Sequence, residues 1–105
     1  AEAYNKDSKD ALAVPLIKLV RERAGDSNHS AWEGLTGDAL FNFIVKKRQL
    51  ELAFEGQRYW DLVRWGLAAQ EIPGFKANKH ELFPIPLDEI NLNSAIEISD
   101  QNPGY

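Results

Sequence analysis

The chain has 105 residues, of which 44% are hydrophobic and 10% aromatic, which is enough for one modest core and too apolar for a disordered chain. Its net charge of −4 provides no basic surface for nucleic acid, and it has no cysteine for disulfides or thiolate metal sites. The longest nearly apolar run, residues 40–45, is far shorter than the roughly 20 residues that span a bilayer.

The first clear helical pattern covers residues 15–24, while the ten residues at the start of the chain carry little pattern. Apolar side chains share one face of this segment and charged side chains share the other. Pro15 lies either in the first turn or at a kink of a helix that begins near Asp7. Gly25 follows two arginines and predicts the end of the helix.

Residues 26–37 are rich in turn-forming residues and predict a loop. Trp32 is the one large aromatic residue in this loop. Large aromatic side chains are usually buried, so one interpretation is that Trp32 packs on a neighbouring helix. The other interpretation is a platform for stacking on a sugar, which makes Trp32 the candidate ligand-binding residue.

Two further helices are predicted over residues 38–55 and 57–66, with Gly56 as the break between them. On the wheel of the first, two glutamates and an arginine lie among the apolar side chains rather than opposite them, which predicts a buried or half-buried ion network. With the charges of the next helix, its members are Arg48, Glu51, Glu55, Arg58, Asp61 and Arg64. Losing one partner would leave another charge unpaired at a cost of about 3–5 kcal/mol, so Glu55→Ala is expected to lower the melting temperature.

The rest of the chain predicts little regular structure. Residues 72–79 form a connector, and the two prolines of LFPIP at residues 82–86 predict an extended path without a pairing strand. Residues 87–91 have the length of one short helical turn, and the tail beyond them is irregular. The expected fold class is therefore all-α, with three main helices, an irregular C-terminal tail and no substantial sheet.

No residue pattern for catalysis, a cofactor or a metal is found. The two histidines stand far apart in predicted loops, and no serine lies in a nucleophile elbow. Glu51 and Glu55 have a spacing similar to that of a glycosidase carboxylate pair. However, Arg48 and Arg58 would keep both carboxylates ionised, which is the opposite of what a general acid needs. We predict a protein that is not an enzyme and needs no cofactor.

Three motifs in the chain resemble the SusD/RagB family of outer-membrane nutrient-binding lipoproteins. The most specific is RQLELAFEGQRYWDLVRWG at residues 48–66, and the others are VRERAG at residues 20–25 and the closing LFPIP and NPGY elements. The chain departs from the family pattern at Lys47, just before this motif, and within the motif at Gln49, at Gln57 and at the aromatic pair Tyr59 and Trp60. Ser94 replaces a proline that is common in the family, which leaves the path of that turn open.

The resemblance implies that residues 1–105 are a single piece, the C-terminal part of a longer SusD-like chain. Its helices would be the last of the family's tetratricopeptide-like helices together with a helix pair packed beside them. A signal peptide and a lipid-anchored cysteine would lie upstream and hold the protein at the cell surface of the outer membrane.

The resemblance implies a function in the non-catalytic capture of oligosaccharide or polysaccharide nutrients, or sometimes of peptide, and in their delivery to a SusC-type TonB-dependent transporter. Family members bind sugar mainly through upstream residues, so this piece would be mainly structural. The alternative is a helical protein–protein interaction module with no small-molecule ligand. The length of the parent chain would distinguish the two.

Overall fold

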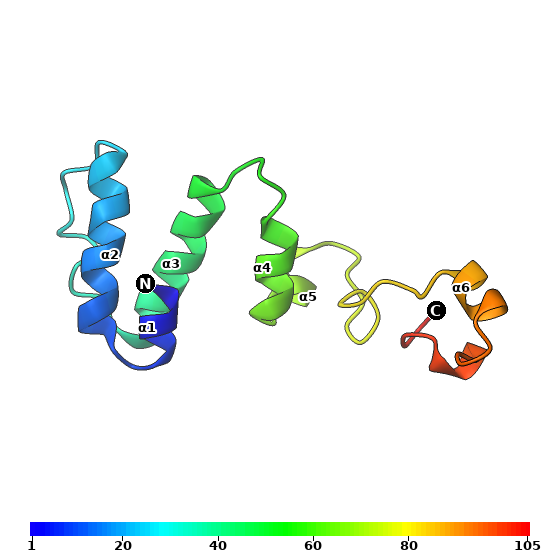
Figure 1. Cartoon of the computed structure of the whole chain (residues 1–105). Coiled ribbons are helices and arrows are strands. Elements are labelled where there is room, and N and C mark those ends of the chain that lie inside the picture. Colours follow the sequence, from blue (N-terminus) through cyan, green and yellow to red (C-terminus); the bar gives the residue numbers. More distant parts are fainter. The chain divides into compact units, whose positions relative to one another are not determined.

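The computed structural model describes residues 1–105, and all its regular elements are helices (Figure 1). They are α1 (Glu2–Lys6), α2 (Asp10–Arg23), α3 (Gly37–Glu51), α4 (Arg58–Arg64), α5 (Ala68–Glu71) and α6 (Leu87–Leu92), with a 3₁₀ turn at Ile98–Asp100. The absence of any strand confirms the predicted all-α class. None of the helices combines the length and the apolar character needed to cross a membrane.

The chain divides into two compact units, residues 1–56 with α1 to α3 and residues 57–105 with α4 to α6. The core of the first unit lies where α2 meets α3. Ala13 and Ile17 of α2 are buried there with Leu40 and Ile44 of α3. Each pair is spaced four residues apart, so both side chains of a pair lie on the same face of their helix.

A polar clamp joins α1, α2 and the start of α3. The side-chain amide of Asn5 donates hydrogen bonds to Asp10 (2.8 Å) and to the Gly37 carbonyl (3.0 Å), and the Gly37 amide donates to Asp10 (2.7 Å). Asn5 is buried, so these bonds satisfy polar groups that water cannot reach. No pattern in the sequence predicted either α1 or this clamp.

Helix α2 begins at Asp10, so Pro15 lies inside the helix and not in its first turn. Proline has no amide hydrogen, and its ring occupies the space of the preceding turn, so one backbone hydrogen bond of α2 is lost at this position. The side chain of Pro15 is exposed, away from the core residues of the same helix.

Helix α3 ends at Glu51, four residues before the predicted end at Glu55. The backbone leaves the helical path in the next residues, because Phe54 and Gly56 have positive φ angles of 67° and 73°. Left-handed residues cannot continue a right-handed helix. The helical wheel that placed Glu55 beside Arg48 and Glu51 is therefore wrong beyond Glu51.

In the second unit, the predicted helix over residues 57–66 is α4, and the short helix α5 follows after a bend at Gly66. Leu62 of α4 and Ala68 of α5 are buried. Helix α6 at Leu87–Leu92 confirms the short helical turn expected there, and it buries Ile90. The 3₁₀ turn is the only regular element in the tail.

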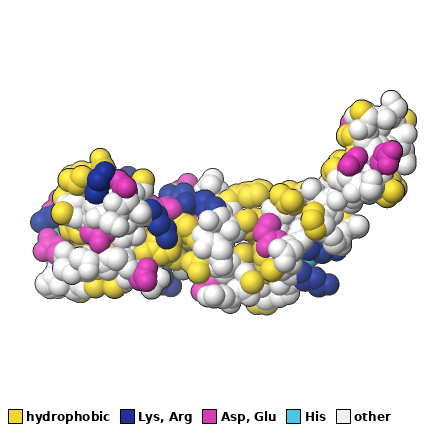
Figure 2. Space-filling model, turned by 90° about the horizontal axis from the view of Figure 1, so that it is seen from below, with side chains coloured by type: hydrophobic (Ala, Val, Ile, Leu, Met, Phe, Trp, Pro, Cys, Tyr) yellow, Lys and Arg dark blue, Asp and Glu magenta, His cyan; other side chains and the backbone are white.

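Many apolar side chains remain at the surface of both units (Figure 2). On α2, the exposed ones are spaced to share one helical face, and they are Leu12, Leu16, Leu19 and Val20. The side chain of Phe54 is fully exposed on the turn after α3. An apolar helix face of this kind is typical of a surface that packs against another part of a protein.

Candidate functional site

Trp32, the candidate ligand-binding residue, is only 3% exposed and belongs to the core of the first unit. Its ring stacks on Phe43 of α3 with a centroid distance of 5.2 Å, and His29 packs against it at 5.3 Å. A sugar platform needs a ring face open to solvent, so this geometry favours the packing interpretation. Sugar binding by Trp32 stays a prediction, and it would require the ring to leave the core.

The VRERAG motif ends α2 with a Schellman motif. The amide of Gly25 donates to the Glu22 carbonyl, and the amide of Asp26 donates to the Arg21 carbonyl. Gly25 has a φ of +83°, a conformation that favours glycine. The Arg21 guanidinium then returns to the Asp26 carboxylate through two hydrogen bonds of 2.9 and 2.6 Å. This pairing lowers the pKa of Asp26 below its ordinary value, aided by the amide of Asn28.

The charges at the end of α3 are more exposed than predicted. Arg48 is half-buried, whereas Glu51 and Glu55 are both exposed. Glu51 forms a salt bridge with Arg23 of α2. The expected burial of the two glutamates is therefore wrong. Glu51 is the last residue of α3, and Glu55 lies in the turn beyond the end of the helix.

The charges of α4 form two local ion pairs. Nε and Nη2 of Arg64 donate to the same oxygen of Asp61 at 3.0 and 2.9 Å, and the Asp61 side chain is only 6% exposed. Arg58 lies 3.5 Å from Glu71 of α5. A network that links these charges to Arg48, Glu51 and Glu55 would join the two units of the chain. That network stays a prediction.

Side chains of the C-terminal tail form hydrogen bonds with backbone groups of the LFPIP segment, which forms no strand. Gln101 accepts a hydrogen bond from the Ile85 amide (2.7 Å) and donates one to the Ile85 carbonyl (3.0 Å). Asn102 and Tyr105 donate to the carbonyls of Phe83 and Leu82. The family resemblance identified LFPIP and NPGY together as closing elements of the chain. No local pattern predicted the hydrogen bonds of Gln101.

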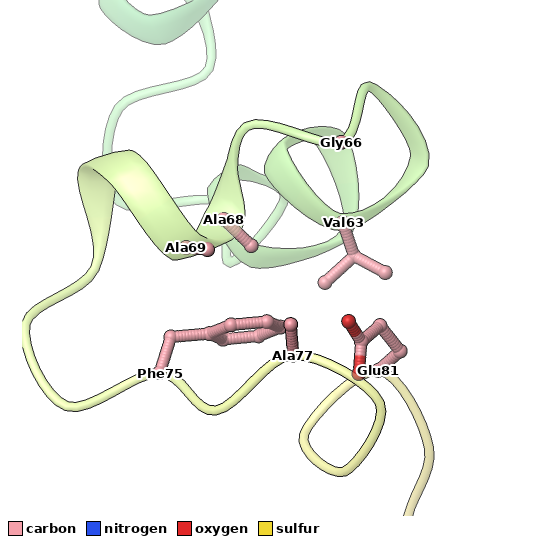
Figure 3. Close-up of a pocket in the computed structure, with 7 residues that line it drawn as sticks. All are labelled: Val63, Gly66, Ala68, Ala69, Phe75, Ala77 and Glu81. Carbon is pink, nitrogen blue, oxygen red and sulfur yellow. The ribbon is translucent and has the colours of Figure 1, made fainter.

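A cavity of about 100 Å³ lies between the helices of the second unit and the loop that follows them (Figure 3). Phe75, Ala77 and Glu81 line its loop side. Val63, Gly66, Ala68 and Ala69 line its helical side. No sequence pattern predicted a site at these residues, because they come from two helices and a loop and have no shared spacing.

Comparison with known proteins gives consistent matches. The family model described as the SusD family matches residues 1–81. SusD-like protein P2 of Formosa agariphila is 37% identical over 119 residues, which cover 100% of this chain and 23% of that protein. SusD-like protein P25 of the same organism is 33% identical over 118 residues, which cover 100% of this chain and 22% of that protein. No solved structure gives a significant match.

The chain thus spans less than a quarter of the length of these curated relatives. The family match covers α1 to α5 and the loop as far as Glu81, and the matches to the relatives extend through the closing LFPIP and NPGY elements. On these grounds, the chain belongs to the SusD family.

Proposed function

We propose that this chain is the C-terminal part of a longer SusD-like protein that captures oligosaccharide nutrients at the cell surface. The protein passes the glycan, uncleaved, to a SusC-type TonB-dependent transporter in the outer membrane, and an upstream lipid anchor holds it there. The observation that carries this proposal is the family match over residues 1–81, together with two SusD-like relatives that align with the whole chain.

The role of these 105 residues is mainly structural. The stacked ring of Trp32 and the paired carboxylate of Asp61 are both engaged in packing or hydrogen bonding within their own units. Retaining glycosidases place two carboxylates about 5–5.5 Å apart, with one of them kept protonated. Glu51 is instead paired with Arg23, and Glu55 lies in the turn beyond the end of α3, which supports a role without bond cleavage.

The exposed apolar face of α2 supports packing against the rest of the parent protein. Leu12, Leu16 and Leu19 are each at least 40% exposed, and burying a leucine side chain contributes about 1.5–3 kcal/mol. The relatives are more than four times as long as this chain. In a parent protein of similar length, the remaining residues would provide a surface that packs on this face.

The same face also suits the second candidate function, a helical module that docks another protein and binds no small ligand. The match to much longer SusD-like relatives favours the first candidate. Co-purification addresses the transporter half of the proposal. The full-length protein should co-purify with a SusC-type transporter from outer membranes, and a lipoprotein that always purifies alone would contradict delivery to such a partner.

A gel-retardation experiment tests the capture half. The full-length protein should migrate more slowly in native gels that contain its polysaccharide, and incubation with the same glycan should release no reducing ends. Bovine serum albumin in the same gels controls for sieving by the polymer. Release of oligosaccharide products would overturn the proposal of a binding protein without catalysis.

A further inference from the structure

The cavity of the second unit contains an unsatisfied carboxylate oxygen. Oε1 of Glu81 accepts a hydrogen bond from the Asn78 amide at 3.1 Å. Oε2 is buried and has no hydrogen-bond partner. A buried acceptor without a donor is unfavourable, so this oxygen favours any group that brings a donor into the cavity.

The charge of Glu81 is also unpaired. No lysine or arginine forms a salt bridge with it, although two lysines lie in the same loop. Lys79 instead donates to the Gly104 carbonyl at 2.5 Å and lies over the Tyr105 ring, and Lys76 is exposed. An uncompensated, half-buried carboxylate attracts a cation more strongly than a neutral hydroxyl group.

The remaining lining of the cavity is apolar and aromatic. Figure 3 shows Phe75 and Ala77 facing the helical side, where Ala68 and Ala69 present only methyl groups. A cavity lined by both a ring and a carboxylate suits a cation with a short hydrocarbon stem, because both groups attract the charge and the alkyl groups contact the methyls. No side chain in the lining offers a hydrogen-bond donor, which again suits a ligand that only donates.

The loop that carries Phe75 and Glu81 is fixed before any ligand enters. The Tyr59 hydroxyl of α4 donates to the His80 carbonyl, and the Lys76 amide donates to Nδ1 of His80 at 3.1 Å. The rings of Phe75 and His80 pack in a T-shaped arrangement, with centroids 5.6 Å apart. These contacts hold the carboxylate and the ring in place on α4 and reduce the ordering cost of binding.

We infer that this cavity binds a primary ammonium group on a short alkyl stem, with its N–H groups on Oε2 of Glu81 and its stem between Phe75 and Ala69. A volume of about 100 Å³ holds roughly three water-sized groups at about 30 Å³ each, which is the size of ethylammonium. Gly66, Ala69 and Ala77 are exposed, so the cavity opens to solvent. The same head group ends a lysine side chain. This inference does not rest on the proposed function.

The test is methyl NMR on the full-length protein, labelled at alanine and valine methyls and titrated with ethylammonium chloride. The methyls of Val63, Ala68, Ala69 and Ala77 should shift in a saturable way. A ligand of three non-hydrogen atoms cannot bind tighter than about 1 mM, so weak affinity is expected. Sodium chloride at matched ionic strength and ethanol, the neutral analogue, should produce no saturable shift. Nα-acetyl-lysine amide in a further titration distinguishes a lysine side chain from a free small amine.

Two variants of the cavity and one control variant make the test decisive. Glu81→Gln should weaken ethylammonium binding at least tenfold, whereas Glu22→Gln, an exposed glutamate on α2, should leave it unchanged. Ala69→Leu should also abolish binding by filling the cavity, with the carboxylate still present. Equal binding of ethanol, unchanged affinity in Glu81→Gln, or no saturable shift with any amine would show that the cavity holds only water.

Discussion

At the scale of single residues, the pairing of Arg21 with Asp26 makes the most specific electrostatic prediction. Hydrogen bonds from Arg21 lower the pKa of Asp26, so Arg21→Ala should raise that pKa towards the ordinary value of about 3.9. Titration of the Asp26 carboxyl carbon by NMR measures the change. Arg23→Ala, which removes a neighbouring charge without touching Asp26, is the matched control.

The sign of the pH dependence follows from the direction of this shift. A carboxyl whose pKa is lower in the folded state stabilises the fold fully above its unfolded pKa of about 3.9. That contribution is lost as the pH falls through the lowered value. The difference in stability between wild type and Arg21→Ala should therefore shrink in acid, and a difference that grows there would contradict the pairing.

The exposures of Glu55 and Asp61 predict opposite outcomes for two acidic residues of one motif. Glu55 is exposed, so Glu55→Ala should change the free energy of unfolding by no more than about 0.5 kcal/mol. This prediction replaces the larger loss of stability that was expected from the sequence. Asp61→Ala should cost about 1.5–3 kcal/mol, because it removes charge-assisted bonds from Arg64 to a buried carboxylate. Urea unfolding of both variants measures the two changes in free energy. A large loss of stability in Glu55→Ala would instead support the buried ion network that was predicted from the sequence.

Residue-level predictions from sequence succeeded where the cause was local. Gly25 was expected to end its helix, and it does so because the backbone there needs a positive φ. The burial of Glu55 was wrong, because it depended on α3 continuing for one more turn. The cavity around Glu81 depends on side chains from three separate segments, which no local pattern brings together.

At the scale of elements, glycine placement determines where α2 and α4 end. Gly25→Ala should destabilise the first unit by roughly 1–2 kcal/mol, because an L-residue is strained in the left-handed conformation. Gly34→Ala is the control, since Gly34 has no positive φ and also has open space around it. Equal melting temperatures for the two variants would show that the end of α2 does not need a left-handed residue.

The LFPIP segment gives a second element-scale prediction. The side-chain amide of Gln101 forms hydrogen bonds with both the amide and the carbonyl of Ile85. A neighbouring strand would form the same two bonds in a sheet. Gln101→Ala should therefore speed hydrogen exchange at the Ile85 amide. Ser99→Ala, an exposed position in the adjacent 3₁₀ turn, should leave that rate unchanged. Unaltered exchange in Gln101→Ala would contradict the role of this side chain.

The helices themselves were largely predictable from periodicity. Helices α3 and α4 bury part of their apolar face, whereas α2 buries Ala13 and Ile17 and leaves the apolar face of Leu12, Leu16, Leu19 and Val20 exposed. Their ends were less predictable. Asp10, rather than Pro15, begins α2, and the sequence left that choice open. Helix α1 was missed because its five residues have no apolar face and depend on Asn5 bonding to other elements.

At the scale of the whole molecule, we propose that these 105 residues are a structural piece and that the ligand site of the parent protein lies elsewhere. The family match and the lengths of the relatives support a longer protein, and the exposed face of α2 provides a surface for packing against it. Within the chain, the aromatic residue first considered as a sugar platform is buried against Phe43. The glycan site is therefore expected outside residues 1–105.

Calorimetric titration of one polysaccharide into the full-length protein and into the isolated chain of residues 1–105 tests this separation directly. Circular dichroism first confirms that the isolated chain is helical. We expect saturable binding with measurable heat for the full-length protein and little or none for the isolated chain. Equal affinity in both titrations would contradict this expectation and place the glycan site within these 105 residues.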